Sequence, residues 1–353
     1  MTEQINAGFD LSLLKNKLRF TFDYYIKNTS DLLIYLSIPS ASGYSSYPTN
    51  VGEIQNKGAE FSLNANIIDK TFKWNLSGNI SFNKNKVINL GNTSATFGDV
   101  YLKDTNLALG QPLHITKAGS PIGSYYGYKI GGIYQNETEI TDGPEDTANP
   151  EPGDFKFVDI SGPDGVPDGK ITSDDRTIIG NPYPDFIFGI TNDFSWKNFS
   201  FSFLIQGNIG QDVINLNNYA LASLNRSSQT NVLKEAWEQR WTGEGTSNTY
   251  PKAKMGGSGP FSKRFTDFLV EDGSFVRLKN ITLSYNLQQK FLSDLGIKNL
   301  KLIASATNLL TLTKYSGYDP EVNGSNRSGL TPGVDFGTIP QYRTFSLGIN
   351  INF

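Results

Sequence analysis

The last twelve residues of the chain, 342–353, alternate between large apolar and small polar side chains. From Phe345, the fourth of them, the apolar residues occupy every second position, at Phe345, Leu347, Ile349, Ile351 and Phe353. Because successive side chains of a strand point to opposite faces, this period predicts a strand with one apolar and one polar face. The same pattern recurs along the whole chain. It favours the wall of a membrane β-barrel that is apolar toward lipid and polar toward the lumen.

The composition agrees with a strand-built membrane protein. Only 37% of the 353 residues are hydrophobic, and the mean hydropathy is −0.35, which is low for a chain that buries its apolar residues in a packed interior. No run approaches the roughly 18 consecutive apolar residues that a membrane helix needs. The net charge of −3 argues against nucleic acid as a partner.

The chain contains few of the residues on which catalysis usually depends. It has no cysteine, which excludes disulfides and thiolate chemistry, and its single histidine, His114, lies in a predicted strand, where we expect a structural role. The acidic pairs Glu137/Glu139 and Asp174/Asp175 lie in predicted loops with no partner base. We therefore expect that the protein is not an enzyme.

The alternating segments predict strands joined by turns of two very different lengths. About eleven strands are expected, at residues 5–14, 18–27, 60–68, 72–83, 112–118, 123–135, 186–196, 198–208, 274–287, 299–310 and 342–353. Tight turns, such as the one at 69–70, alternate with long connections at 136–185, 209–273 and 311–341. This alternation is typical of a bacterial outer-membrane barrel, which has short periplasmic turns and long extracellular loops.

The odd number of predicted strands indicates an incomplete barrel. If the last strand ends in the periplasm, the first strand runs inward from the outside, whereas closed single-chain bacterial barrels have an even number of strands. An open half-barrel would leave two unpaired strand edges in lipid, at a cost of several kcal/mol for each unsatisfied backbone group. We therefore expect this chain to be the back part of a larger barrel.

Longer motifs are spread from one end of the chain to the other. They include GSPIGSYYGYKIGGIYQ at 119–135 and ATNLLTLTKYSGYDPEVN at 306–323. Further motifs lie at 50–64, 153–215, 233–253, 274–287 and 342–353. In these segments the chain resembles the C-terminal half of a SusC/RagA family TonB-dependent outer-membrane transporter of Bacteroidetes.

The resemblance implies a fold and a domain organisation. The fold is all-β, a transmembrane antiparallel barrel of about 22 strands with long extracellular loops and a plugged lumen. Residues 1–353 would supply about half of its wall. The signal peptide, the TonB box and the plug domain are not recognised in this chain. They are expected in an N-terminal region that is missing here.

The resemblance also implies a function and partners. It implies TonB-dependent uptake of oligosaccharides, or of peptides, across the outer membrane of a Gram-negative cell. A SusD-like surface lipoprotein would capture the substrate, and the TonB–ExbB–ExbD complex would act through the missing N-terminal region. Outer-membrane lipid would surround the wall.

Two other classes of protein remain open from the sequence. One is an independent outer-membrane barrel, porin-like or oligomeric, without coupling to TonB. The other is a secreted all-β carbohydrate-binding module or enzyme. Long rows of polar residues opposite aromatic rows count against the secreted alternative, because no soluble core would accept them.

An acidic loop at 164–175 resembles an EF-hand calcium loop. Asp164, Asp168 and Asp175 would take ligand positions 1, 5 and 12, and Lys170 would offer its backbone carbonyl at position 7. The third position is a valine and the last is the shorter aspartate; if the loop is bulged, Asp159 or Ser161 would supply the missing ligand. The alternative is an extracellular turn with solvated carboxylates. Calcium is the one cofactor that the sequence suggests.

A second candidate is the segment 229–245, whose apolar residues recur at helical spacing. It predicts a helix within an extracellular loop. Trp237, Trp241, Tyr219 and Tyr250 could stack on sugar rings, because an aromatic face suits the apolar face of a sugar. The alternative, which we favour, is that these side chains pack the helix onto the loops around it.

Overall fold

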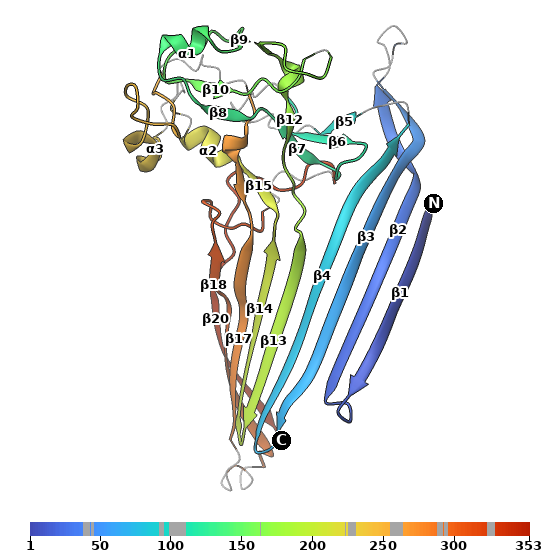
Figure 1. Cartoon of the computed structure of the whole chain (residues 1–353). Helices are drawn as coiled ribbons and strands as arrows, with labels where there is room; N and C mark the ends of the chain where they lie inside the picture. Colours follow the sequence, from blue (N-terminus) through green and yellow to red (C-terminus); the bar gives the residue numbers. More distant parts are fainter. Residues whose placement is uncertain are drawn as a thin grey trace.

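The computed structural model contains one tall, curved wall of strands with a layer of loops at its upper end (Figure 1). It describes residues 1–37, 43, 46–91, 95–98, 111–162, 164–222, 224, 231–254, 264–287, 292, 296–322 and 329–353. The wall is a nine-stranded antiparallel sheet in the order β1-β2-β3-β4-β13-β14-β17-β18-β20. Its strands are β1 (Thr2–Leu13), β2 (Leu18–Ser37), β3 (Ser46–Asp69), β4 (Phe72–Leu90), β13 (Phe186–Trp196), β14 (Phe199–Ile209), β17 (Phe275–Leu287), β18 (Asn299–Thr313) and β20 (Thr344–Asn352).

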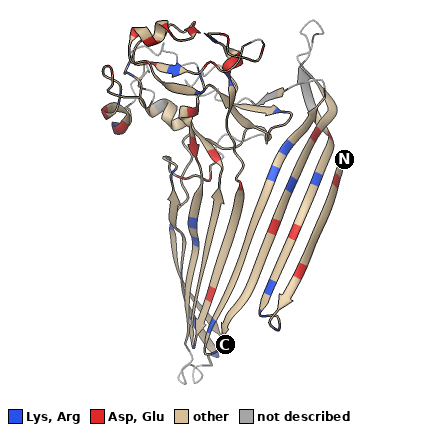
Figure 2. Cartoon of the chain, viewed as in Figure 1, with Lys and Arg blue, Asp and Glu red and all other residues tan. Residues whose placement is uncertain are grey.

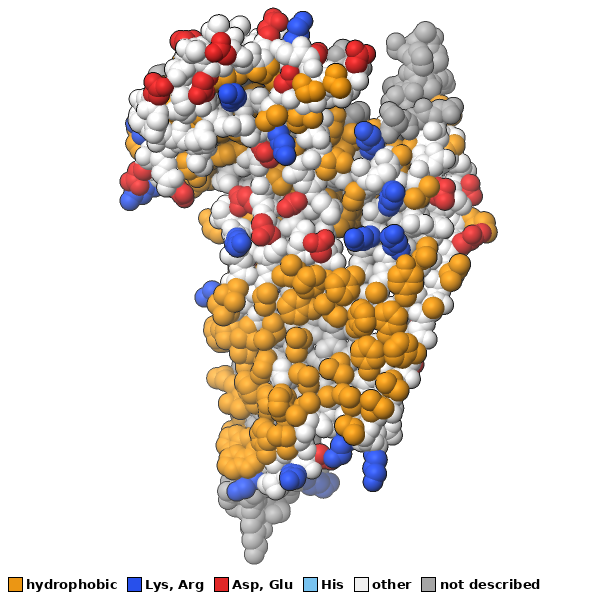
Figure 3. All heavy atoms as spheres, viewed as in Figure 1, with side chains coloured by type: hydrophobic (Ala, Val, Ile, Leu, Met, Phe, Trp, Pro, Cys, Tyr) orange, Lys and Arg blue, Asp and Glu red, His pale blue; other side chains and the backbone are white. Residues whose placement is uncertain are grey.

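The strand register keeps the apolar positions on one face of the wall. Phe9 pairs with Phe22, Phe22 with Phe61, Phe61 with Ile80, and Ile80 with Phe188. Since a slip of one residue would move a strand's apolar side chains to the other face, this register is the one that gathers them together. Figure 3 shows the result as a broad apolar band across the outside of the wall. We call this side the lipid face and the opposite side the lumen face.

The loop layer lies between successive wall strands in sequence and holds the remaining elements. A four-stranded sheet has the order β12-β7-β6-β5, a three-stranded sheet has the order β16-β15-β19, and two pairs are β10-β8 and β11-β9. These strands are β5 (Ala95–Gly98), β6 (His114–Lys117), β7 (Ser124–Gly127), β8 (Ile130–Ile133), β9 (Glu145–Asp146), β10 (Phe155–Phe157), β11 (Lys170–Ile171), β12 (Thr177–Gly180), β15 (Asp212–Asn215), β16 (Val270–Asp272) and β19 (Val334–Asp335). The helices are α1 (Glu137–Thr141), α2 (Leu216–Leu221), α3 (Lys234–Glu238) and the 3₁₀ turns η2 (Ser173–Asp175) and η4 (Asp267–Leu269).

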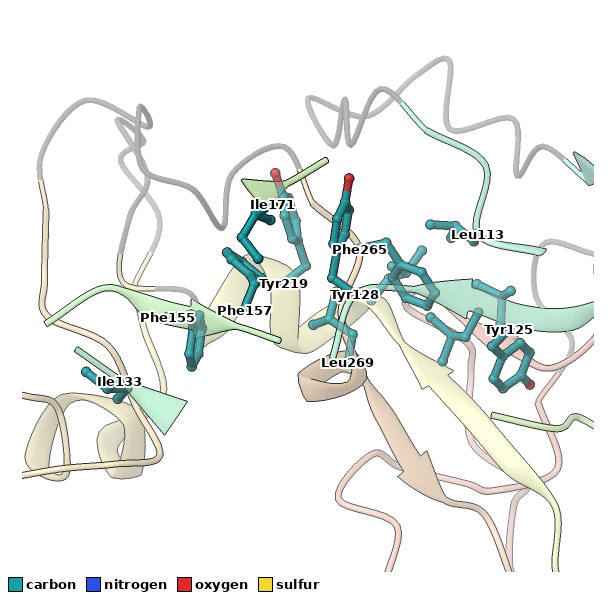
Figure 4. Close-up of a cluster of buried hydrophobic side chains, with 13 residues drawn as sticks. Leu113, Tyr125, Tyr128, Ile133, Phe155, Phe157, Ile171, Tyr219, Phe265 and Leu269 are labelled. Atoms are coloured by element: carbon teal, nitrogen blue, oxygen red, sulfur yellow. The ribbon is translucent and has the colours of Figure 1, made fainter. Parts of the chain in front are cut away.

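The largest packed hydrophobic core among the described residues lies in the loop layer and not in the wall (Figure 4). Its buried members come from connections that are far apart in the sequence: Leu113, Tyr125, Tyr128, Ile133, Phe155, Phe157, Ile171, Ile214, Leu216, Tyr219, Phe265, Leu269 and Val334. The wall, in contrast, exposes its large apolar side chains, up to 90% for Leu347. This division is expected if the layer lies in water and the wall in lipid.

The structure changes two sequence-based expectations and agrees with a third. Residues 112–118 and 123–135 do not form wall strands but contribute β6, β7 and β8 to the loop layer, so the described part of the wall has nine strands and not about eleven. The helix expected over 229–245 is confined to α3, and residues 229 and 230 lie outside the described part. The directions of the first and last wall strands relative to each other are as expected, because β1 begins at the end with the loop layer and β20 ends at the opposite end (Figure 1).

No helix in the described part of the chain is both long and apolar enough to cross a membrane.

Candidate functional site

The lumen face of β1 to β4 carries a polar groove of about 550 Å³. Its lining combines amides, carboxylates, an ammonium and a phenol: Gln4, Asn6, Asp23, Tyr25, Lys27, Asn56, Glu60 and Asn83. All of these residues alternate with the apolar residues of the lipid face, so the period of two that builds the wall also builds the groove. Such a lining offers many hydrogen-bond donors and acceptors to a polar, extended ligand.

Side-chain hydrogen bonds hold the centre of this groove in place. The Tyr25 hydroxyl donates to Asn83 Oδ1 at 3.1 Å, and the Asn83 amide donates to Asn56 Oδ1 at 3.4 Å. The Tyr25 ring can lie across β3 because the residue beneath it is Gly58, where a Cβ atom would come within 2.7 Å of the Tyr25 hydroxyl oxygen. Glycine at position 58 therefore makes room for the Tyr25–Asn83 contact.

Three of the four aromatic candidates for sugar stacking are packed within the loop layer. Tyr219 is buried in its hydrophobic core. The Trp241 indole packs against the same core and donates to Gln135 Oε1 at 3.1 Å. The Tyr250 ring meets the Phe268 ring edge to face, with the ring centroids 5.9 Å apart. These contacts favour the packing role for Tyr219, Trp241 and Tyr250.

Trp237 differs from these three. It lies on α3 and is 49% exposed, with the Arg240 guanidinium over its ring at 3.7 Å from the centroid. The structure therefore does not bring the four aromatic side chains onto one stacking face. A stacking role stays a prediction, and Trp237 is the candidate with an accessible ring.

In the acidic loop, the predicted metal-ligating carboxylates accept hydrogen bonds from the backbone. Asp175 is fully buried, and its Oδ1 accepts from the N–H groups of Ile160 and Ser161 at 2.8 and 3.1 Å. Its Oδ2 accepts from the N–H of Thr172 at 2.7 Å, which closes a capping box at the start of η2. Asp175 therefore organises the turn, a role for which a carboxylate accepting several N–H groups is well suited.

The other predicted ligands lie more toward solvent. Asp159 Oδ2 accepts from the Gly169 N–H at 2.7 Å, Asp168 Oδ1 accepts from the Lys170 N–H at 3.0 Å, and Asp164 is exposed. Within the described residues, no group of three or more His, Cys, Asp or Glu is arranged so that it could hold a metal ion. Calcium binding by this loop stays a prediction.

Calcium titration of the full-length protein, after treatment with EGTA, tests that prediction. If the loop binds calcium, micromolar Ca²⁺ raises the melting temperature of the wild type, because a ligand that binds only the folded state stabilises it. The Asp164→Asn variant should lose this rise, while its buried Asp175 turn remains intact. An identical melting temperature with and without Ca²⁺ would mean that the loop does not bind calcium and is a polar turn held by its own hydrogen bonds.

His114 is a structural residue of the loop layer. Its ring is fully buried on β6, and the neutral tautomer donates from Nε2 to the Pro332 carbonyl at 2.9 Å. Its ring also meets the Tyr125 ring edge to face at 5.4 Å, and the Tyr125 hydroxyl bonds the carbonyls of Asp212 and Gly333. Burial lowers the pKa of His114 to about 4, since the charged imidazolium would lose its hydration.

This depressed pKa predicts that the loop layer loses stability in mild acid. The unfolded histidine protonates near pH 6.5 and the folded one only near pH 4, so the stability contribution is complete above pH 6.5 and falls as the pH drops between these values. At pH 5 the loss should be about 2 kcal/mol. Thermal melts of the wild type and of His114→Gln at pH 7 and pH 5 check this. An equal pH dependence in both proteins would rule His114 out as the cause.

Two arginines that the sequence patterns did not indicate, one partly and one fully buried, hold the loops together. Arg264 binds Asp146 through both guanidinium ends, at 2.5 and 2.8 Å, and its guanidinium lies over the rings of Tyr128 and Phe157. Asp146 and Arg264 are 118 positions apart, so no local spacing could reveal the pair. Such bidentate, partly buried pairs give the layer a fixed shape.

Arg277 plays the same part where β17 enters the layer. Its side chain is only 1% exposed, and it donates to Asp319 Oδ1 at 2.7 Å, Glu321 Oε2 at 2.5 Å and Thr311 Oγ1 at 2.9 Å. Its guanidinium also lies 5.1 Å from the Phe275 ring centroid. The connection after β18 is thereby held against the upper end of the wall.

Together, the apolar lipid face, the polar lumen face and the folded loop layer define a β-barrel wall of an outer-membrane protein. The family model described as "TonB dependent receptor-like, beta-barrel" matches residues 1–309, so the chain belongs to the TonB-dependent receptor β-barrel family. The family consists of transport receptors, which agrees with the expectation of a protein that is not an enzyme.

Individual relatives narrow the class to the SusC/RagA type, as the motifs indicated. TonB-dependent receptor P3 of Formosa agariphila is 37% identical over 361 residues, which cover 100% of this chain and 34% of the relative. TonB-dependent receptor SusC of Bacteroides thetaiotaomicron is 30% identical over 355 residues, 99% of this chain and 31% of SusC. Among solved structures, the RagAB peptide transporter matches with a TM-score of 0.77 and 25% identity, over 100% of this chain and 35% of that one.

The chain thus spans about a third of the length of the curated relatives that it matches. The family and these relatives locate the nine-stranded wall in the outer membrane.

Proposed function

We propose that this chain forms the C-terminal part of the barrel of a TonB-dependent importer that takes up oligosaccharides, or peptides, with a SusD-like surface lipoprotein. The observation that carries the proposal is the likeness to SusC and to the RagAB peptide transporter along the whole chain, loop layer included. The remainder of the full-length protein would supply the plug domain and the segment that meets the TonB–ExbB–ExbD complex.

The chemistry of the lumen face supports a polar, extended substrate. The groove offers amide and hydroxyl groups from Asn56, Asn83 and Tyr25, which can bond to sugar hydroxyls and to peptide groups alike. Asp23, Glu60 and Lys27 add charge of both signs, so the groove does not select strongly for one sign. Its role in the mechanism is to present hydrogen-bonding partners along the path that opens when the plug moves.

The ordered structure of the loop layer supports the proposal of a SusD-like lipoprotein as the partner. A surface that receives a lipoprotein repeatedly is best held in one shape before binding, because ordering loops during binding costs affinity. The ion pairs of Arg264 with Asp146 and of Arg277 with Asp319 provide such order.

Uptake by cells that express the full-length protein and its lipoprotein tests the proposal. Fluorescent oligosaccharides and peptides too large for porins should enter cells with functional TonB and not cells without it. Asn83→Trp, which fills the lumen groove, should slow uptake several-fold, while Phe82→Trp, on the lipid face of the same strand, should leave it unchanged. Uptake that does not need TonB would instead favour the porin-like alternative.

A further inference from the structure

Three lysines lie on the lipid face directly above the apolar band. Lys57 on β3 and Lys84 on β4 are register partners, and Lys86 follows Lys84 by two positions on the same face. The next register pair below them on that face is Ala59 and Phe82, where the apolar band begins. Basic residues lie near the upper ends of β3 and β4 in Figure 2, and Figure 3 shows Lys and Arg side chains just above the band.

The ammonium groups of this cluster are not paired with acidic side chains of the described residues. Lys57, Lys84 and Lys86 are all exposed, and none of them takes part in a salt bridge within the described residues. The register partner of Lys86 is Gln55, which is uncharged. Because like charges directly opposite each other destabilise a strand pair, an anion from outside the chain would stabilise the arrangement.

An apolar groove of about 350 Å³ lies on the same face, farther down the same strands. Large side chains from β2, β3, β4 and β13 surround it: Phe20, Phe61, Leu63, Ile80, Phe188 and Ile190. It contains Gly78, whose missing side chain leaves the space open. A Cβ atom there would lie 3.6 Å from the Gly189 carbonyl oxygen and 3.7 Å from Ile190 Cγ1, which are ordinary contact distances.

The spacing between cluster and groove fits one lipid leaflet. Gly78 and Lys84 are six positions apart, which is about 20 Å along a strand. With a strand tilt of about 40°, the groove lies about 15 Å below the lysines, half the thickness of the hydrocarbon core. A lipid whose head group meets the lysines can therefore lay an acyl chain in the groove.

We propose that Lys57, Lys84, Lys86 and the Gly78 groove form a binding site for one phosphorylated glycolipid of the outer leaflet. The ammonium groups bind the phosphates, as compact positive charges do in many phosphate sites, and the groove takes one acyl chain. The leaflet follows from the position of the lysines at the end of the wall that carries the loop layer (Figure 1). The inference rests on the outer-membrane orientation and not on the transported substrate.

Binding of purified lipid A to the full-length protein in detergent, followed by native mass spectrometry, tests the site. The variant Lys57→Gln/Lys84→Gln/Lys86→Gln should bind lipid A about ten-fold more weakly or worse. A matched control, Lys27→Gln/Lys73→Gln/Lys301→Gln, removes three charges from the lumen face and should bind like the wild type. Dephosphorylated lipid A should bind the wild type as weakly as lipid A binds the first variant.

The groove needs a variant of its own. Gly78→Leu should weaken lipid A binding several-fold while keeping the preference for the phosphorylated form, because only the acyl chain loses its place. Equal binding by wild type and the Lys57/Lys84/Lys86 variant would overturn the proposal, and so would equal binding of phosphatidylglycerol and lipid A. If the wild type binds lipid A but takes up neither oligosaccharides nor peptides, the result would count against the proposed function and not against the lipid site.

Discussion

Replacement of Arg277 by leucine is expected to lower the stability of the loop layer by about 3–5 kcal/mol. The buried guanidinium is the only described partner of opposite charge within salt-bridge distance of Asp319, itself 7% exposed. Without it, Asp319 becomes a buried carboxylate whose remaining hydrogen bonds come from the backbone N–H groups of Glu321 and Gln341. Removing one member of a buried ion pair costs more than the pair itself contributes, because the other charge stays buried.

Hydrogen exchange across residues 311–322 measures this effect, together with the melting temperature of the full-length protein. Two further variants separate charge from packing. Arg277→Leu/Asp319→Asn should recover a large part of the lost stability, since it removes the isolated charge as well. Arg240→Leu should have little effect, because this guanidinium lies over the exposed Trp237 ring. Arg277→Leu melting at the wild-type temperature would show that the connection after β18 is held by other contacts.

An arginine at position 347 is expected to impair insertion of the last strand into the membrane. Leu347 is 90% exposed on the lipid face of β20, opposite Ala304 of β18. Since β20 has nine residues, this position lies near its middle, where a charged side chain on the lipid face costs about 2–4 kcal/mol. The yield of heat-modifiable, folded protein in the outer membrane is the measurement.

Ser346→Arg is the matched control for this substitution. Ser346 precedes Leu347 and therefore points to the lumen face, where it pairs with Ser305. There an arginine can stay hydrated, so the folded yield should remain close to that of the wild type. If the two variants lose the same amount of folded protein, the assignment of faces on β20 is wrong.

The alternation of apolar and polar residues predicted the membrane part of the wall well, because lipid on one side and water on the other impose a period of two. It failed above the apolar band. β3 begins at Ser46, whereas the alternation indicated a strand only from residue 60. The stretch before that, VGEIQNKG at 51–58, borders the loop layer, and no lipid requires every second residue to be apolar there.

The loop layer was the part least accessible from sequence. Residues 112–118 and 123–135 read as wall strands because they are apolar, yet Leu113, Ile115 and Tyr125 are apolar because they are buried. In the acidic loop, the carboxylates indicated a calcium site, but the hydrogen bonds of Asp175 to Ile160 and Ser161 depend on how the turn folds. Contacts between residues 100 or more positions apart produce no local sequence pattern, so they could not be predicted from the sequence.

Single-cysteine scanning of β14 tests the central claim, a wall with one side in lipid and one in the lumen. This chain has no cysteine, so once any cysteines in the rest of the full-length protein are replaced, labels can be placed one at a time along Phe199–Ile209. With the full-length protein in vesicles, a lipid-soluble quencher should reach labels at 199, 201 and 203, and a water-soluble quencher should reach those at 200 and 202. Equal access of both quenchers to odd and even positions would contradict the barrel wall and every role assigned to its two faces.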